Sequence, residues 1–310
     1  MTQEIIIAIL ATAITAGTPI LFAALGEILT ERSGILNLGV EGMMLVGAVG
    51  GFVFAVRTGN PWVGVAAAMI AGGSLAFIHA FLTVTMQANQ VVSGLALTLF
   101  GTGLSGFLGK NYIGIPVENA FKPLSLGILS DIPFAGPIFF QHDILVYLSY
   151  LLVPLLWFIV YKTRPGLNLR AVGENPASAD SLGVSVYRVR YIYVTIGGML
   201  AGLGGAYLSL AYAPTWLENM TAGRGWIAVA LVIFATWNPL RAMLGSYIFG
   251  GIDAFGFRAQ TMGILVPSFF LKMLPYIFTI LVLIIVTRKA MINRIGAPGA
   301  LGLPYDREER

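Results

Sequence analysis

Apolar runs separated by short polar or proline-containing stretches recur along the whole chain. Each run is about as long as the roughly 20 residues that a helix needs to cross the hydrocarbon core of a bilayer. The pattern therefore predicts an all-α, polytopic bundle of membrane helices with about nine spans, within a range of about eight to ten. We expect the spans at roughly residues 4–28, 35–56, 61–86, 91–108, 143–161, 191–213, 225–240, 242–257 and 264–287.

The later spans depart from the regular pattern. The segment from Gly225 to Pro239 is short for a crossing, and Pro239 and Arg241 interrupt its apolar run. This segment and the next are therefore candidates for broken or re-entrant helices, which persist at membrane depth only inside protein or beside a water-filled cavity. Pro267 and Pro275 predict a kink near the outer end of the ninth span.

Composition indicates one membrane domain over residues 1–310 and no soluble domain, because 57% of the residues are hydrophobic and only 10% are charged. The absence of cysteine excludes disulfides, thiolate catalysis and cysteine metal sites. A net charge of +4 does not indicate binding to nucleic acid. No basic residue precedes Arg32, so the charged region of a cleavable signal peptide is missing, and we expect the first helix to be retained.

The segment from Lys162 to Arg190 is the longest polar and basic stretch, with five of the eighteen basic residues. By the positive-inside rule it is cytoplasmic, which places the N-terminus outside and the C-terminal tail inside. Twelve of the eighteen basic residues then fall inside: Arg32, Lys162, Arg164, Arg170, Arg188, Arg190, Arg241, Arg288, Lys289, Arg294, Arg307 and Arg310. The outer loop at residues 109–142 contains four prolines and is expected to cover the external mouth.

A short helix is predicted in the middle of this basic segment. Asn175 can cap it, Pro176 suits the first helical position, and Gly183 can close its far end. The result is a helix of about two turns from Pro176 to Leu182, too short to be stable alone in water. Spacing alone leaves two interpretations open, a docking element for another protein or an ordinary capped loop.

Two carboxylates lie inside predicted spans. Helical spacing puts Asn37 and Glu41 on one face of the second span. A charge there costs about 3 kcal/mol, so Glu41 should face the bundle interior or water. It could carry a proton, contact a substrate or act as a structural anchor, and we favour the anchor. Asp253 poses the same question, with Arg258 as a local partner, whereas Glu27 is expected to be solvated near the cytoplasmic interface.

Neutral polar residues gather at the start of the fourth span. Asn89 and Gln90 end a tight turn, and Ser93 and Thr98 follow in a glycine-rich run. Hydroxyls in membrane helices usually bond to backbone carbonyls, so a structural role is the default. If these groups face a pore, they would suit a neutral, hydroxyl-rich solute.

Enzymatic motifs are weak. Gly103–Gly106 resembles the Gly-x-Ser-Gly pattern of intramembrane serine proteases, but that chemistry needs a histidine on a later membrane helix. The only histidines are His79, upstream, and His142, in the outer loop. The chain has no His-Glu-x-x-His motif and no phosphate loop, so any ATP must be bound by another chain.

Four segments resemble a known family. They are ERSGILNLGVEGM at 31–43, NQVVSGLAL at 89–97, RAVGENP at 170–176 and WNPL at 237–240. In this order, over about residues 20–260, they are similar to permease subunits of ATP-binding-cassette (ABC) importers. The similarity is greatest to the nucleoside and simple-sugar branch of the branched-chain amino acid and ribose permease superfamily.

The resemblance implies a role for the basic segment and a set of partners. Its short helix corresponds to the family's coupling helix, which docks on the ATPase and here comprises Glu174, Asn175, Pro176, Ala177, Ser178, Ala179, Asp180, Ser181, Leu182 and Gly183. The implied partners are a second homologous permease, a cytoplasmic ABC ATPase that binds the ATP, and an extracytoplasmic substrate-binding protein. The implied location is a bacterial cytoplasmic membrane.

We therefore predict a single permease domain of an ABC importer for nucleosides, with no cofactor of its own and no covalent chemistry. Candidate residues of the translocation pathway are Asn37, Glu41, Asn89, Gln90, Ser93 and Thr98. The alternative within the family is a simple-sugar, ribose-like importer. From another class, the alternative is an ion-coupled secondary transporter that uses Glu41 or Asp253, and an intramembrane protease ranks below both.

Overall fold

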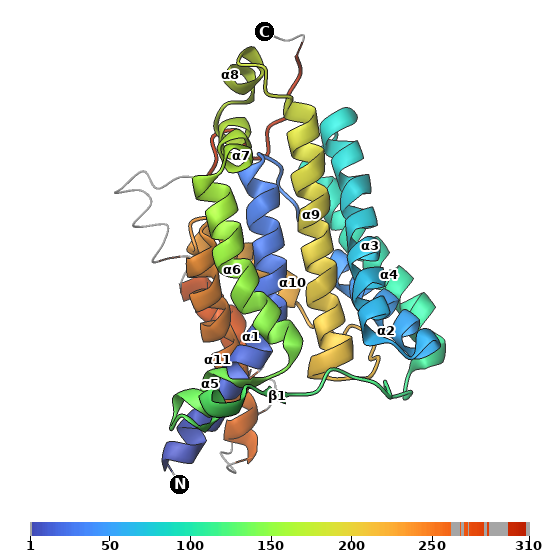
Figure 1. The fold of residues 1–310 in the computed structure, drawn as a ribbon. Helices are drawn as coiled ribbons and strands as arrows, with labels where there is room; N and C mark the ends of the chain where they lie inside the picture. The colour runs from blue at the N-terminus through green and yellow to red at the C-terminus, as the bar shows by residue number, and fades with distance from the viewer. Residues whose placement is uncertain are drawn as a thin grey trace.

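The computed structural model is a helical bundle, and it describes residues 2–261, 267, 270–271, 273–281, 284 and 297–307. Within that part of the chain, six helices are long and apolar enough to cross a membrane. They are α1 (Thr2–Arg32), α2 (Val40–Thr58), α3 (Pro61–Ala80, continued by η1, Phe81–Thr85), α4 (Gln90–Gly109, continued by η2, Lys110–Tyr112), α6 (Ile144–Lys162) and α9 (Val186–Tyr207, continued by η4, Leu208–Tyr212) (Figure 1).

Two further helices correspond to the seventh and eighth predicted spans. The first, α10 (Arg224–Phe234), has 11 residues and is about 16 Å long, too short to cross a bilayer core of about 30 Å. It is separated from α11 (Pro239–Thr261) by the break predicted at Pro239. The ninth predicted span, residues 264–287, lies largely outside the described residues, so the expected total of about nine stays a prediction.

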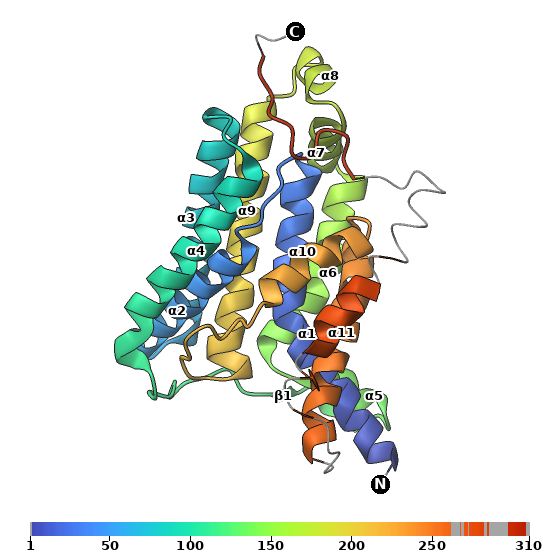
Figure 2. The same ribbon diagram turned by 180° about the vertical axis from the view of Figure 1, so that it is seen from behind.

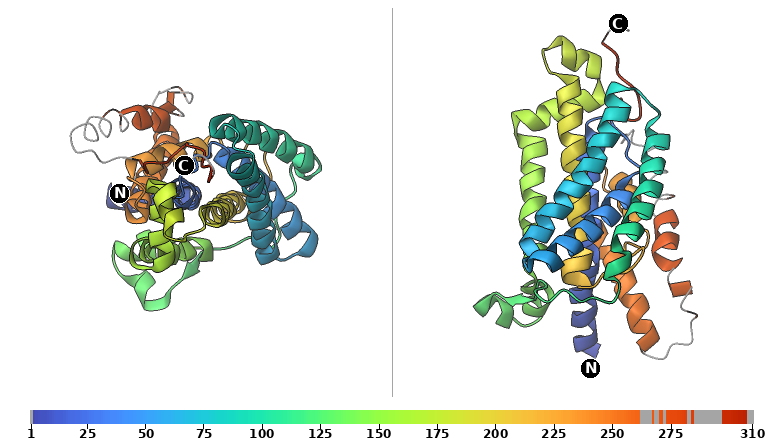
Figure 3. Two further views of the ribbon diagram at one scale, coloured as in Figure 1. Left: turned by 90° about the horizontal axis from the view of Figure 1, so that it is seen from above. Right: turned by 90° about the vertical axis from the view of Figure 1, so that its right-hand side faces the viewer.

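The helices are arranged around a central pair. α1 and α9 lie side by side, with α2, α3 and α4 on one side and α6 and α11 on the other (Figures 2 and 3). The first described residues lie at one end of the bundle, and the C-terminal segment 297–307 lies at the opposite end (Figure 1).

Close helix packing on one side depends on glycines. A methyl group on Gly47 of α2 would lie 2.5 Å from the Cα atom of Gly202 in α9. On α3, a methyl group on Gly72 would lie 2.8 Å from the same Cα atom. The backbones of these three helices therefore approach closely, which small residues at helix interfaces permit.

The basic segment folds into two short helices at the C-terminal end of the bundle, α7 (Arg164–Glu174) and α8 (Pro176–Ser181). The predicted cap is confirmed, because the Asn175 Oδ1 atom accepts a hydrogen bond from the Ser178 N–H at 3.0 Å. α8 ends one residue before the predicted Leu182, and Gly183 follows with a φ of 83°. The helix α7 was not predicted.

One member of the basic segment is not in water. The prediction placed Arg190 on a water-facing loop, but it lies in the second turn of α9 and is only 1% exposed. Its Nε atom donates to the Ser33 carbonyl oxygen at 3.3 Å. Its Nη1 atom lies 3.5 Å from the Leu303 carbonyl oxygen, so Arg190 connects the end of α1 with the C-terminal segment 297–307.

The loop at residues 109–142 contains short elements rather than another long helix. They are η3 (Gly127–Asp131), α5 (Ala135–Phe139), β1 (Leu124–Ser125) and β2 (Gln141–His142), and the two strands pair antiparallel with Leu124 opposite His142. This loop lies at the end of the bundle away from α8 (Figure 1).

Candidate functional site

The connection between α1 and α2, Ser33–Gly39, is non-helical backbone inside the bundle. It descends from the end of α1 to α2, which begins lower down (Figure 2). The second span was expected to start near residue 35, but α2 starts at Val40. Backbone groups without helical partners need other hydrogen bonds at this depth.

Side chains of α3 and α4 supply those hydrogen bonds. Gln90 Oε1 accepts from the Leu36 N–H at 2.7 Å, and His79 Nε2 lies 3.1 Å from the Leu36 carbonyl oxygen. Thr98 Oγ1 donates to the Leu38 carbonyl oxygen at 2.8 Å. Ser93 Oγ lies 2.9 Å from the other ring nitrogen of His79. Three of the predicted pathway residues therefore hold this connection in place.

Asn37 shapes the connection from within. Its Oδ1 atom accepts from the Gly39 N–H at 2.9 Å, and its own N–H donates to Glu27 Oε1 at 3.2 Å. Because Asn37 precedes α2, the predicted shared helical face with Glu41 was wrong. The expectation that Glu27 is solvated was also wrong, because it is 1% exposed and bonded to the connection.

Glu41 ties α2 to the start of α10. Its Oε1 atom accepts from the Thr221 hydroxyl at 2.5 Å and the Gly223 N–H at 2.8 Å, and its Oε2 atom accepts from the Gly225 N–H at 2.6 Å. The first N–H groups of a helix lack intrahelical partners and attract negative charge. The structure thus gives Glu41 the surroundings that an anchor requires. We call the connection Ser33–Gly39, Glu41 and the start of α10 the central junction.

The end of α1 is fixed to the turn between α10 and α11. Trp237 donates its indole N–H to the buried Glu31 Oε2 atom at 2.5 Å, and its carbonyl oxygen accepts from the Tyr161 hydroxyl at 3.2 Å. Thr236 and Trp237 have φ values of 50° and 54°, in the left-handed region that bulky residues avoid. The sequence segments 31–43 and 237–240 therefore meet, a contact that sequence reasoning missed.

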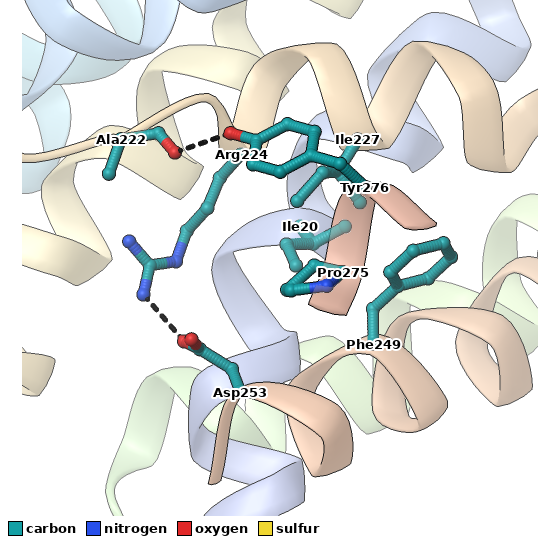
Figure 4. Close-up of a pocket in the computed structure, with 8 residues that line it drawn as sticks. All are labelled: Ile20, Ala222, Arg224, Ile227, Phe249, Asp253, Pro275 and Tyr276. Carbon is teal, nitrogen blue, oxygen red and sulfur yellow. Dashed lines mark hydrogen bonds and ion pairs between the residues drawn. The ribbon is translucent and has the colours of Figure 1, made fainter. Parts of the chain in front are cut away.

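A cavity of about 400 Å³ lies beside the central junction (Figure 4). Arg224 and Asp253 form an ion pair in it, with Nη2 and Oδ2 3.0 Å apart and side chains 14% and 31% exposed. The Tyr276 hydroxyl donates to the Ala222 carbonyl oxygen at 3.0 Å. The predicted local partner of Asp253 was Arg258, but the ion pair in the cavity is with Arg224. Its lining residues are Ile20, Ala222, Arg224, Ile227, Phe249, Asp253, Pro275 and Tyr276.

The remaining predicted residues lie at the end of the bundle that carries α8. Asn89 caps α4, because its Oδ1 atom accepts from the Val92 N–H at 3.1 Å. Within residues 174–183, Ala179 is buried at 2% exposure, whereas Leu182 is 85% exposed. Asp180 pairs with Arg307, and Glu174 accepts from the Gly299 N–H at 3.2 Å. The predicted coupling residues comprise the end of α7, the whole of α8 and the turn that follows it.

Six apolar helices that can span a bilayer, interrupted backbone inside the bundle and a charged cavity beside it define a multi-pass membrane protein of the transport class. A family model for the "Branched-chain amino acid transport system / permease component" matches residues 9–287. The chain belongs to this family.

Three relatives match almost the whole chain. TsgC13 of Haloferax volcanii, an ABC transporter permease protein whose name assigns glucose provisionally, is 43% identical over 95% of this chain and 96% of its own. The nucleoside ABC transporter permease protein NupC of Lactococcus lactis is 37% identical over 96% of both chains. The guanosine ABC transporter permease protein NupQ of Bacillus subtilis is 35% identical over 99% of both. The predicted resemblance is confirmed.

Proposed function

We propose that this chain is the permease subunit of an ABC importer for nucleosides. The observation that carries the proposal is the similarity to NupC and NupQ, which covers 96% and 99% of this chain at 37% and 35% identity. The cavity beside α10 supports it, because polar groups there can replace water around a neutral, hydroxyl-rich solute. A simple sugar is the second candidate solute, because the name of TsgC13 includes glucose.

The energy source we propose is ATP hydrolysis on a separate cytoplasmic ATPase. This chain contributes one permease domain and no cofactor, and a second permease subunit completes the membrane part. NupP, a guanosine ABC transporter permease protein from the same organism as NupQ, is 25% identical to this chain over 76% of it, which supports a pair of related subunits. We propose that an extracytoplasmic binding protein delivers the solute.

We assign the end of the bundle that carries α8 to the cytoplasm. The basic residues of 162–190 support this orientation by the positive-inside rule. The exposed Leu182 side chain directly after a short, capped helix suits docking onto the ATPase, with residues 174–183 as the coupling element. The N-terminus is then outside and the segment 297–307 inside.

The residues predicted to line the translocation pathway are proposed to support it structurally instead. We propose that Asn37, Gln90, Ser93 and Thr98 hold the Ser33–Gly39 connection at the side of the pathway, and that Glu41 holds α10. Asn89 belongs to the inner end of α4. Alternating access would then change the positions of the connection and α10 relative to α9.

Uptake in membrane vesicles with a panel of labelled nucleosides and sugars tests the function, with the partner subunits co-expressed. We expect concentrative uptake of nucleosides that needs ATP and persists with a protonophore at constant ATP. Uptake of glucose or ribose in preference to every nucleoside would establish the sugar alternative. Uptake that collapses with the proton gradient at constant ATP would establish the secondary carrier.

A further inference from the structure

The start of α10 has a second anchor, Glu41, besides the ion pair between Arg224 and Asp253. Glu41 already binds two N–H groups at the start of this helix and the Thr221 hydroxyl just before it. Charges inside a membrane bundle are costly and usually belong to substrate or ion pathways. The exposure of Asp253, at 31%, shows that the pair borders the cavity rather than packed side chains.

We propose that this cavity binds the transported nucleoside, with Asp253 accepting hydrogen bonds from the ribose hydroxyls and Tyr276 contacting the base. This inference rests on the proposed function and names its binding site. A carboxylate offers about four acceptor positions, and the bond to Arg224 uses one of them. The remaining positions can accept two neighbouring hydroxyl groups.

The aromatic side of the cavity suits a planar base. The hydroxyl of Tyr276 is held by the Ala222 carbonyl oxygen, while the side chain stays 43% exposed. Figure 4 shows the Phe249 ring across the cavity from the Arg224–Asp253 pair, with the Tyr276 ring along the edge between them. The volume of about 400 Å³ falls in the range of about 300–1,000 Å³ for small-molecule sites.

The test compares uptake of a labelled ribonucleoside with uptake of its 2′,3′-dideoxy analogue. Asp253→Asn combined with Arg224→Gln removes both charges together, so neither is left unpaired. We expect the KM for the ribonucleoside to rise about tenfold while the KM for the analogue changes little, because only the ribonucleoside loses hydrogen bonds. Tyr276→Leu should raise both values. Phe255→Leu, on an exposed part of α11 outside the cavity, is the matched control.

Unchanged KM values in the charge-free double variant and in Tyr276→Leu, at normal protein level, would overturn the assignment of the cavity. Equal rises for ribonucleoside and analogue in the double variant would also overturn it, because a purely structural pair would act on both. If the unaltered transporter takes up no nucleoside, the proposed function fails instead, so the two failures are distinguishable.

A separate observation concerns residues 297–307, which we call the C-terminal strap. The Ala300 N–H donates to the Gly173 carbonyl oxygen at 2.8 Å, and the Gly302 N–H donates to the Gly34 carbonyl oxygen at 3.1 Å. Gly173 is at the end of α7, and Gly34 belongs to the central junction. The strap therefore connects the segment beside α8 with the connection that starts α2.

The strap also contacts α8 itself. Arg307 Nε lies 3.1 Å from Asp180 Oδ2, and Tyr305 is buried at 8% exposure in a cluster with Val172, Ala179 and Val186. We propose that the strap transmits movement of α8 to the central junction. The strap would be a second connection between α8 and the bundle. The first is the chain itself, which continues from α8 into α9, whereas the strap leads to the central junction.

Tyr305→Ala tests this role, because it removes a side chain from the buried cluster that also contains Ala179 of α8. We expect the amount of nucleoside taken up per ATP hydrolysed to fall, while assembly with the ATPase persists. Leu303→Ala is the matched control, since this neighbouring side chain is 56% exposed and the hydrogen bonds of Leu303 are made by its backbone. A chain ending at residue 296 should show the same loss, and wild-type coupling in both variants would overturn the proposal.

Discussion

Two regions of the subunit are stabilised in different ways: the packed helices α2, α3 and α9, which we call the frame, and the central junction. In the former, regular helices approach until their glycine backbones touch, as Gly47 and Gly202 do. In the central junction the backbone is irregular, and side chains such as Glu41 and Gln90 bind several of its polar groups. Dense packing resists gradual deformation, whereas a few hydrogen bonds can be exchanged one at a time. The comparison indicates where the subunit is a rigid frame and where it can move.

The largest effect is expected from Glu41→Leu. It should remove the hydrogen bonds that hold α10 to α2 and leave the packing of α2, α3 and α9 unchanged. Three donors, the Thr221 hydroxyl and the N–H groups of Gly223 and Gly225, lose their acceptor. Each unsatisfied buried group costs about 1–3 kcal/mol. We expect a marked fall in protein level and uptake, measured by immunoblot and by nucleoside transport.

Glu41→Gln sharpens the same prediction. An amide keeps one acceptor oxygen but places a donor where the second carboxylate oxygen was, opposite an N–H or hydroxyl donor. Uptake should therefore stay substantial but below the wild-type value, at a protein level between wild type and Glu41→Leu. A Gln variant with no uptake at normal protein level would point to proton transfer and to the secondary carrier.

Gly47→Ala should destabilise the packing of α2 against α9 and leave the hydrogen bonds of the central junction in place. Its methyl group would lie 2.5 Å from the Gly202 Cα atom, so α2 and α9 would have to separate. Overpacking of this kind costs about 1–3 kcal/mol. We expect a lower melting temperature of the purified subunit. Gly103→Ala is the control, because no atom lies within 4 Å of the added methyl group, and it should be neutral or slightly stabilising.

Trp237→Phe should weaken the fixation of α1 with a smaller effect. It removes the indole N–H that donates to Glu31 and keeps most of the ring volume. Leaving a buried acceptor without this partner costs about 1–2 kcal/mol. We expect a modest drop in melting temperature. Trp226→Phe is the control, because Trp226 of α10 is 37% exposed. An equal drop in melting temperature there would show that the effect comes from the smaller ring and not from the lost hydrogen bond.

The same contrast explains what could be predicted from the sequence. Hydropathy gave the positions of the long helices, and the Asn175–Pro176 cap predicted α8, because both signals are local. The break at 33–39 was missed because Ile35, Leu36 and Leu38 are as apolar as a helix. A non-helical segment of this kind depends on partners from α3 and α4, which no local pattern reveals.

Pairings of distant residues could not be predicted either. Asp253 was assigned the nearest downstream arginine, whereas Arg224 meets it from another helix. The burial of Glu27 and Arg190 likewise depends on tertiary packing, because charge alone favours a solvated position. Sequence therefore singled out Asn37 and Glu41 of the junction, but the fold determines what each of them binds.

The smallest expected effect tests whether a single hydrogen bond of the junction matters on its own. Thr98→Val keeps the shape of the side chain but loses the hydroxyl that donates to the Leu38 carbonyl oxygen at 2.8 Å. The loss should be about 0.5–1.5 kcal/mol. Thr102→Val, whose hydroxyl bonds to the Thr98 carbonyl oxygen of its own helix, removes a bond of similar length without touching the connection. If the junction moves during transport, Thr98→Val should change the rate of nucleoside uptake while Thr102→Val does not, even where both lower the melting temperature equally. Equal uptake in the two variants would mean that the bond to Leu38 stabilises the subunit only, and that movement occurs at α10 instead.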